Sequence, residues 1–254
     1  MRTEILYEDK SIMVVRKPAG LAVQSAGIGQ PDVVSELKSY LAKLPSAGRP
    51  GKGEPYLGIV HRLDQPVEGL LVFAKDKKAA AALSKQLTEG ALNKHYYAVL
   101  CGYPDCPEGD LVDYLRKEGN MAVAVTGREQ EFADAKIAAL HYRILEEINA
   151  PSPLALADVT IGTGRFHQIR VQFAHAGFPL LGDTKYGMAA LKEAMPAQKY
   201  RGVALCAYSL ELVHPISGKK MGFRVVPKNP AFAGFAMEEL KKLTENETGI
   251  SKRG

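Results

Sequence analysis

Short runs of apolar residues separated by polar turns follow one another along most of the chain, and they predict mainly strands. The stretch TEILYEDKSIMVVRKPAG (residues 3–20) predicts two short strands with a turn at residues 8–11. Residues 69–75 are apolar but too few for a buried helix, so they predict an interior strand. Further strands are expected at residues 94–102, 137–145, 154–162, 203–215 and 220–227.

Apolar residues at helical spacing predict a smaller number of helices. Residues 32–44 repeat apolar positions three and four apart after Asp32, a typical N-cap residue. An alanine-rich segment between Asp76 and Gly90 predicts a second helix with a cap and a stop signal. Two more helices are expected at residues 166–177 and near 230–243.

Three segments carry no clear period. Residues 45–56 are rich in Pro, Gly and basic residues, which fits a solvated connector and, as the other possibility, a loop that orders on a phosphate backbone. Residues 103–134 form either a hairpin or long loops, and residues 244–254 form a polar tail that we expect to be frayed.

The strands outnumber the helices and do not alternate strictly with them. This order favours an α+β fold with a mixed, largely antiparallel central β-sheet flanked by helices over a doubly wound parallel sheet. Because no internal repeat or linker is visible, we expect a single domain over residues 1–243, followed by the tail.

Composition narrows the functional classes only slightly. The 254 residues are 46% hydrophobic and 24% charged, and no run of 18 apolar residues or signal peptide is present, so a cytoplasmic protein is expected. The 3 cysteines have no C-x-x-C spacing, so neither a disulfide framework nor a metal site is expected. A net charge of +5 permits a polyanionic partner without requiring one.

The segment IGTGRFHQIR (residues 161–170) offers a possible dinucleotide site. Gly162 and Gly164 follow a strand, and the acidic Asp183 lies 19 residues beyond Gly164. However, the bulky His167 occupies the third glycine position, and the surrounding pattern is not βαβ. We therefore regard a dinucleotide-dependent oxidoreductase as a distant alternative.

The segment HRLDQPVEGLLVFAK (residues 61–75) places three polar side chains directly before the predicted interior strand. Charged side chains are rarely buried unless they are paired or functional. Taken alone, Asp64 could simply cap a turn that contains Gln65 and Pro66.

Several motifs in order give this segment a more specific meaning. HRLDQPVEGLLVFAK, LNKHYYAVLCG (residues 92–102), GTGRFHQIRVQFAHAGFPLLGDTKYG (residues 162–187) and the opening ILYEDKSIMVVRKPAGLAV together resemble the RluA-type RNA pseudouridine synthases. The resemblance covers roughly residues 4–227.

The resemblance implies an isomerase that detaches a uridine from its ribose, turns the base and rejoins it through C5, without a cofactor. It implies catalytic roles for Asp64, Tyr96 and Arg170, with Arg170 as the ion partner of Asp64. By the same resemblance, Arg62 fills the gap left by the flipped base. The remaining residues expected at the RNA-binding and base-flipping site are His61, Arg165, His167 and Leu181.

The chain departs from the family pattern close to Asp64. Residues 65–68 read Gln-Pro-Val-Glu where the family has a sequence closer to Arg-Asp-Thr-Ser, so Glu68 adds a negative charge. Phe166 and Gln172 stand where Thr and His are common. An RNA-binding protein of the same fold that has lost catalysis is therefore the main alternative, and Glu68 is its only support.

The resemblance also implies the partner. We expect a structured RNA, with ribosomal RNA favoured over transfer RNA, bound by the catalytic domain itself because the family's small extra N-terminal domain is absent. Residues 43–53, 103–134 and the basic tail are expected to help to hold it. We expect a monomer that contacts no membrane.

Overall fold

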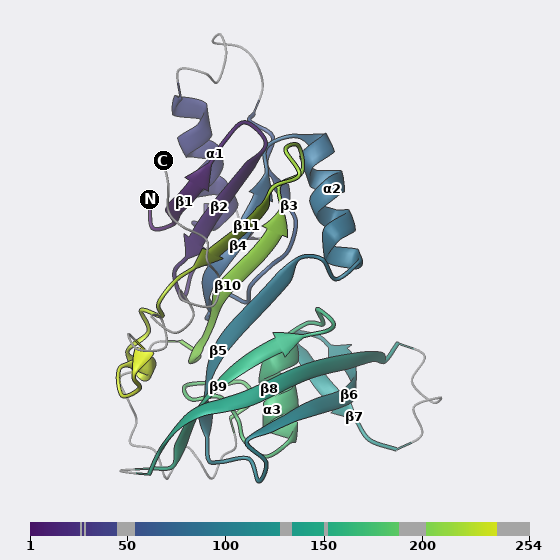
Figure 1. Cartoon of the computed structure of the whole chain (residues 1–254), viewed down its shortest axis with the longest axis vertical. Coiled ribbons are helices and arrows are strands. Elements are labelled where there is room, and N and C mark those ends of the chain that lie inside the picture. The colour runs from purple at the N-terminus through teal and green to yellow at the C-terminus, as the bar shows by residue number, and fades with distance from the viewer. Residues whose placement is uncertain are drawn as a thin grey trace. The chain divides into compact units, whose positions relative to one another are not determined.

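The computed structural model describes residues 1–25, 27, 29–44, 54–127, 134–149, 152–187 and 202–237, and the structure below refers to these. The chain forms two compact units (Figure 1). Unit 1 comprises Met1–Asn93 and Ala207–Val225, and unit 2 comprises Lys94–Cys206 and Val226–Gly254. The expected connector at residues 45–53, the tail at 244–254 and the end of the helix expected near 230–243 lie outside the described residues.

Unit 1 is built on strands in the order β1, β2, β4 and β10, with β3 on β4 and β11 on β10. The pairs β1–β2, β2–β4, β3–β4 and β10–β11 are antiparallel. Every residue of β2 and β4 is buried, so both faces of these two strands are covered, which explains their continuous apolar sequences. The bounds are β1 Glu4–Glu8, β2 Ile12–Lys17, β3 Gly58–Ile59, β4 Glu68–Ala74, β10 Leu205–Val213 and β11 Lys220–Arg224.

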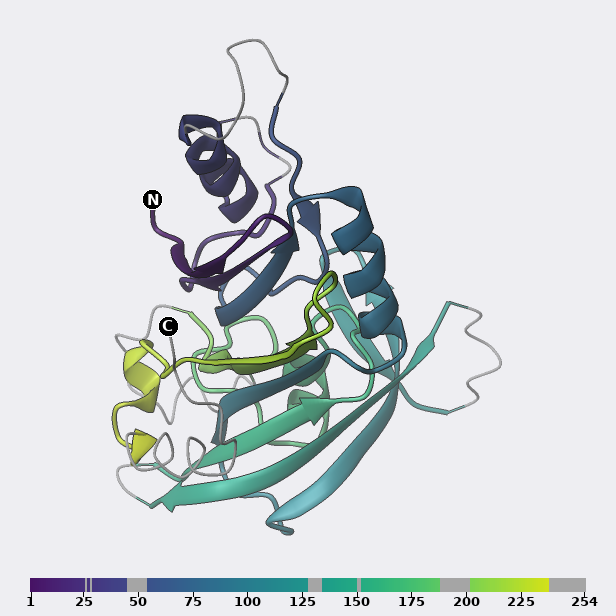
Figure 2. The same cartoon turned by 45° about the horizontal axis from the view of Figure 1, so that its top comes forward.

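Two helices complete unit 1, and both begin at the predicted caps. In α1 (Val33–Lys43) the Asp32 carboxylate accepts from the Ser35 N–H, and in α2 (Lys77–Thr88) the Asp76 carboxylate accepts from the Ala79 N–H. Figure 2 shows α2 running beside the sheet of this unit. Its buried residues pack into a core shared with β2, β4 and β10, formed by Ile12, Val14, Leu70, Val72, Ala74, Ala79, Leu83, Leu92, Leu210 and Leu212.

Unit 2 contains strands in the order β5, β9, β8, β6 and β7, and each neighbouring pair is antiparallel. The helix α3 (Gln168–His175) packs on β6 and β7 through Val171, which meets Leu115, Ala122 and Ala138 in a small core. The strand bounds are β5 Asn93–Cys101, β6 Glu108–Glu118, β7 Met121–Val125, β8 Lys136–Ile148 and β9 Leu154–Ile161.

These elements confirm the expected α+β class with a mainly antiparallel sheet. Of the two possibilities for residues 103–134, the hairpin is correct, because β6 and β7 pair directly. The strand before the G-x-G turn, β9, pairs antiparallel with both neighbours, so this turn is not part of a βαβ unit. Within the described part of the chain, no helix is long and apolar enough to cross a membrane.

The prediction of a helix near residues 230–243 is wrong for the first residues of this range. A single 3₁₀ turn (Pro230–Phe232) stands there, and it ends at Ala233. The Asn229 side chain caps this turn by accepting from the Ala231 N–H, and its amide donates to the Val203 carbonyl, 3.3 Å away. These bonds stabilise a tight turn within unit 2, where the apolar spacing alone predicts a longer helix.

Candidate active site

In unit 1, the histidine of the HRLD segment is a structural extension of the short strand β3. The β3–β4 ladder has two pairs, Gly58 with Ala74 and Ile59 with Phe73. Beyond them, the His61 imidazole Nε2 accepts the Val72 N–H at 3.3 Å. His61 is only 8% exposed. The ring therefore fixes the start of the Asp64 loop to the interior strand.

Asp64 lies in the tight turn that follows. Its backbone carbonyl accepts from the Val67 N–H at 3.1 Å, while its carboxylate belongs to a half-buried residue. Arg62, two residues earlier, is exposed. A partly accessible carboxylate on a closed turn can meet a ligand while its backbone stays fixed.

The side chain of a buried lysine bonds to the backbone of this turn. Lys17 is 0% exposed, and its ammonium group donates to the carbonyls of Pro18, Leu21 and Gln65 at 3.1, 2.7 and 3.0 Å. Burial lowers the pKa of Lys17 to about 7, although the negative charges of Asp64 and Glu68 act to raise it. Lys17 thus links the end of β2 to the residue that follows Asp64.

The extra negative charge of Glu68 is neutralised within unit 1. Glu68 is 3% exposed, and its carboxylate lies 3.3 Å from the guanidinium of Arg16 on the neighbouring strand β2. Arg16 is itself 9% exposed. Glu68, which departs from the expected family pattern after Asp64, therefore belongs to a buried ion pair in which each charge compensates the other.

In unit 2, β5 carries the predicted tyrosine. Tyr96 is 5% exposed and lies opposite Val159 of β9. Leu181, which is 3% exposed, runs alongside the same strand, because its N–H donates to the Val99 carbonyl at 2.8 Å. β5 therefore positions both Tyr96 and the backbone of Leu181.

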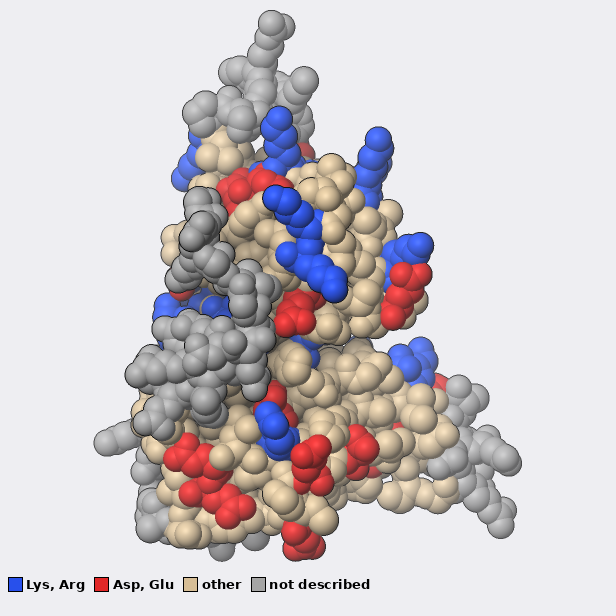
Figure 3. All heavy atoms as spheres, viewed as in Figure 1, with Lys and Arg blue, Asp and Glu red and all other residues tan. Residues whose placement is uncertain are grey.

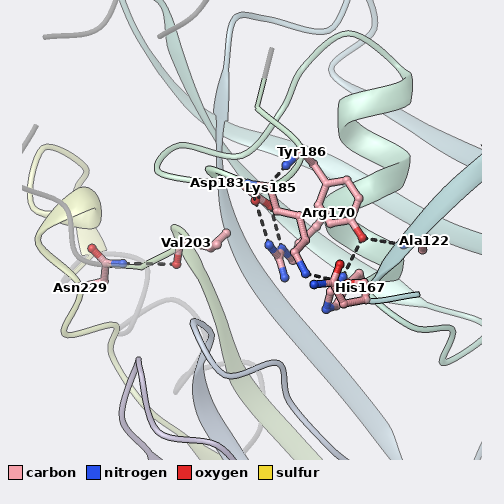
Figure 4. Close-up of polar contacts among 9 residues, drawn as sticks. Ala122, His167, Arg170, Asp183, Lys185, Tyr186, Val203 and Asn229 are labelled. Atoms are coloured by element: carbon pink, nitrogen blue, oxygen red, sulfur yellow. Dashed lines mark hydrogen bonds and ion pairs between the residues drawn. The ribbon is translucent and has the colours of Figure 1, made fainter. Parts of the chain in front are cut away.

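Arg170 projects from α3 and is fixed by an acidic residue of the following turn (Figure 4). Its Nε and Nη2 atoms donate to the two carboxylate oxygens of Asp183 at 2.7 and 2.8 Å, which is a bidentate pair. Both residues are at most 5% exposed. Asp183 also accepts from the N–H groups of Lys185 and Tyr186 at 3.0 and 3.2 Å. The two backbone N–H groups of the turn thus orient the Asp183 carboxylate, and this carboxylate orients the guanidinium plane of Arg170.

Tyr186 connects this pair to the beginning of α3. The Arg170 guanidinium lies 5.1 Å from the centre of the Tyr186 ring, a cation–π contact. The Tyr186 hydroxyl accepts from the Ala122 N–H at 2.8 Å and lies 2.6 Å from His167 Nδ1 (Figure 4). The hydroxyl therefore links the backbone of β7 to the His167 ring.

His167 has a left-handed backbone. With φ at 54°, it is the one non-glycine residue with positive φ among the described residues. Such a conformation is uncommon outside glycine and tends to persist where neighbouring contacts enforce it. Here the Tyr186 hydrogen bond and the stacked ring of Phe166 are such contacts.

Arg165, the remaining predicted residue, lies in the turn before α3. Its Nε donates to the Ile137 carbonyl at 2.9 Å, and its backbone N–H donates to the side-chain oxygen of Gln168 at 3.0 Å. The Gln168 amide in turn donates to the Ala139 carbonyl at 3.0 Å. The GRFHQ turn is therefore anchored to β8.

The predicted residues fall into two sets. Unit 1 holds His61, Arg62 and Asp64 on one short segment, and unit 2 holds Tyr96, Arg165, His167, Arg170 and Leu181. Within unit 2, His167 and Arg170 belong to one connected group. The expected pairing of Arg170 with Asp64 joins one unit to the other and remains a prediction.

Three contributors were not recognised from the sequence. Lys17 is the last residue of the apolar strand β2. A lysine at the start of the KPAG turn is the signal of it in the sequence. Asp183 was considered only as the acid of a dinucleotide fingerprint, and Tyr186 only as part of a motif. Neither the spacing nor the residue type indicates which arginine an acid pairs with.

A family model described as RNA pseudouridylate synthase matches residues 11–175. The ribosomal large subunit pseudouridine synthase D of Zymomonas mobilis is 34% identical over 87% of this chain and 68% of its own length. The Escherichia coli protein of the same name is 36% identical over 86% of this chain and 65% of its own length. The chain thus spans about two thirds of the length of these curated relatives.

Solved structures agree at the level of the fold. The human RNA pseudouridylate synthase domain containing 1 superposes with a TM-score of 0.71 at 19% identity, covering 99% of this chain and 97% of the human chain. Human RNA pseudouridylate synthase domain containing 4 gives a TM-score of 0.69 at 23% identity, covering 94% and 93%. The isomerase class expected from the motifs is the class of the family model and the curated relatives, and the chain belongs to the RNA pseudouridylate synthase family.

Proposed function

We propose that this chain converts one specific uridine of large-subunit ribosomal RNA to pseudouridine. Curated relatives of 34 to 36% identity from several bacteria carry the name ribosomal large subunit pseudouridine synthase D, which favours ribosomal over transfer RNA. No cofactor enters the proposed reaction, and its product is an isomer of the substrate.

Asp64 is the proposed catalytic carboxylate. The target uridine first leaves the helical stack, because its glycosidic atoms are not accessible in a duplex. The ionised Asp64 then acts at C1′ or at the base while the N1–C1′ bond breaks. The uracil turns, a C5–C1′ bond forms, and the C5 proton moves to solvent as N1 takes up a proton, so that atoms and charge balance.

Arg170 and Tyr96 are the proposed partners of Asp64. The Arg170 guanidinium stabilises the ionised carboxylate, and its bidentate pair with Asp183 supports this role by fixing the direction of its remaining donors. Tyr96 stacks on the flipped uracil and assists removal of the C5 proton. Leu181 provides an apolar wall of the pocket.

The other predicted residues hold the RNA or the site. The exposed Arg62 inserts into the gap that the uridine leaves, and Arg165 contacts the backbone of the RNA. For His61 and His167, the hydrogen bonds to the Val72 N–H and the Tyr186 hydroxyl favour a positioning role over direct RNA contact.

The observation that carries the proposal is the half-buried Asp64 carboxylate on a turn that Lys17 and His61 fix in place, in a chain of this family. The alternative of an inactive RNA-binding protein rested on the extra charge of Glu68. Because Arg16 compensates that charge inside unit 1, no described contact favours the alternative.

Tritium release from RNA labelled at C5 of uridine tests the proposal. Ribosomal and transfer RNA from cells that lack the protein are incubated separately with wild type, Asp64→Asn and Glu89→Gln. We expect release from ribosomal RNA by wild type and by the exposed control Glu89→Gln, and a rate at least roughly 10³-fold lower for Asp64→Asn. Sequencing then maps the modified position.

Release from transfer RNA alone would replace the substrate but keep the reaction. If the folded wild type bound RNA and released tritium from neither RNA, the inactive RNA-binding protein would be the correct conclusion. Equal rates for wild type and Asp64→Asn would show that another group is the catalytic carboxylate.

A further inference from the structure

Phe166 is an exposed aromatic residue in the turn before α3, and its ring packs on the neighbouring ring of His167. The residue is 41% exposed. Its ring stacks on that of His167, with centroids 3.8 Å apart and planes inclined by 22°. A single exposed apolar residue is ordinary, but a fixed exposed ring beside the site needs an explanation.

The support beneath this ring is preorganised. His167 takes its left-handed backbone with its side chain bonded to the Tyr186 hydroxyl, which the Ala122 N–H of β7 also contacts. Lys185 of the same turn donates to the Asn120 carbonyl at 2.6 Å, which ties the turn to the β6–β7 hairpin. Two separate contacts to the hairpin therefore resist movement of the Phe166–His167 stack. A strained backbone such as the left-handed conformation of His167 is typical of binding sites.

One cation contacts the ring, and a second precedes it in the chain. The exposed Lys117 of β6 places its ammonium group 5.0 Å from the centre of the Phe166 ring. Arg165 directly precedes Phe166. An aromatic ring with a cation beside it is the combination with which proteins bind unpaired nucleotides, through stacking on the base and attraction to the phosphate.

The charge is local to this place. On β6 and β8 the acidic residues are prominent, and the face of unit 2 drawn in Figure 3 shows several acidic side chains in red. The acidic residues of these two strands are Glu108, Asp110, Asp113, Glu118, Glu146 and Glu147. A polyanion therefore gains little from unit 2 as a whole, which favours a defined contact near Phe166 over diffuse attraction.

From these observations we infer that Phe166, supported by His167 and flanked by Lys117 and Arg165, is a stacking site for an unpaired RNA base next to the target uridine. The inference rests on the proposed function. Phe166 lies two residues before α3, and Arg170 is the third residue of that helix. A base stacked on Phe166 is therefore expected close to the uridine.

Lys117 changes its partner when the base arrives. An exposed cation–π contact is weaker than the stacking of a base on an aromatic ring. The base therefore displaces the ammonium group from the ring, and the long side chain of Lys117 moves to the neighbouring phosphate. Thr is common at this position in the motif that the chain resembles. Phe166 therefore contributes to this chain's choice of RNA.

Fluorescence tests the stacking directly, because the chain contains 0 tryptophans. Phe166→Trp places a single indole at the proposed site, and Ile216→Trp places one at a control position of unit 1 that is 63% exposed. We expect saturating ribosomal RNA to quench the emission of Phe166→Trp by at least half, and to leave Ile216→Trp nearly unchanged. Equal quenching of both variants would overturn the inference.

Kinetics provide the second arm. Phe166→Ala and Phe166→Leu should raise the KM for ribosomal RNA about tenfold with kcat kept within about twofold, since a stacked base is lost from binding. Phe166→Trp keeps an aromatic face and should retain the wild-type KM, and Ile216→Ala should resemble wild type. A KM unchanged in both Phe166→Ala and Phe166→Leu would also overturn the inference.

The two proposals can fail separately. If wild type releases no tritium from any RNA, the proposed function fails, while the quenching of Phe166→Trp by bound RNA still decides the stacking site. If wild type is active and both arms are negative, the stacking site alone is wrong.

Discussion

Lys17 shows how a single buried charge can support a catalytic turn. Its three donors face three backbone carbonyls, so the ammonium group uses its full bonding capacity without a carboxylate in direct contact. One of these carbonyls belongs to Gln65, directly after Asp64. The lysine thus fixes the backbone of the turn, and its charge also acts on the carboxylates of Asp64 and Glu68.

The depressed pKa of Lys17 predicts how stability depends on pH. The folded protein releases this proton near pH 7, whereas the unfolded chain holds it up to about pH 10.4. Between these values the unfolded state binds more protons, so the free energy of unfolding rises with pH, by at most about 1.4 kcal/mol per unit from this group. Below pH 7 both states are protonated, and the contribution is constant.

Urea unfolding of wild type and Lys17→Met between pH 6 and 9.5 measures this effect. We expect the difference between the two proteins to shift in favour of wild type above pH 7, because Met cannot titrate. Parallel curves for the two proteins across this range would contradict the assigned pKa.

At the scale of elements, the turn of residues 183–187 joins α3 to the β6–β7 hairpin. Asp183 orients Arg170, while Tyr186 and Lys185 bond to Ala122 and to the carbonyl of Asn120. Because this turn contacts both α3 and the hairpin, we expect a substitution in the turn to alter the positions of the site residues in unit 2.

Removing one oxygen from this turn should loosen its contacts. Tyr186→Phe leaves the Ala122 N–H and His167 Nδ1 without the hydroxyl, and losing a partner of a buried polar group costs about 1–3 kcal/mol. We expect unfolding at lower urea and faster hydrogen exchange of the Ala122 amide. Tyr114→Phe on β6 serves as the control and should show neither change.

The sequence predicted elements well where burial was one-sided or complete, and poorly elsewhere. The two caps Asp32 and Asp76 and the apolar strand β4 were found from local pattern alone. The β6–β7 hairpin was ambiguous because most of its residues are partly exposed, so alternation carries little signal. Near residue 230, a side-chain cap set a short turn that apolar spacing could not reveal.

For the site, the motif order predicted which residue types would matter, but not their contacts. The Arg170–Asp183 pair depends on how a turn folds back onto a helix, and the Lys17 bonds depend on three carbonyls from separate segments. Contacts of this kind are tertiary, and no local pattern encodes them.

At the scale of the molecule, unit 1 is closed by a strand that comes much later in the chain. β10 lies next to β4, and Gly69 of β4 lies against the backbone of Ala207 in β10. A Cβ placed on Gly69 would lie 2.4 Å from the Ala207 carbonyl oxygen, and its φ of 128° is unfavourable for other residues. This position therefore requires glycine for two independent reasons.

Comparing two glycine substitutions separates these reasons. Gly90 also has positive φ, at 73°, but nothing lies within 4 Å of its added Cβ. Gly90→Ala should cost about 1–2 kcal/mol from backbone conformation alone. Gly69→Ala should cost clearly more, because the Ala207 backbone must also move. Equal losses in urea unfolding would show that the strand β10 yields easily.

The same arrangement has a consequence during synthesis on the ribosome. Residues 1–93 are made first, but Ala207–Val225 leave the ribosome only after more than a hundred further residues. At 5–20 residues per second, the apolar strand β4 waits roughly 7–28 s before β10 can pair with it. During that interval its open edge can pair with other nascent chains, so early chaperone contact with this stretch would increase the yield of folded protein.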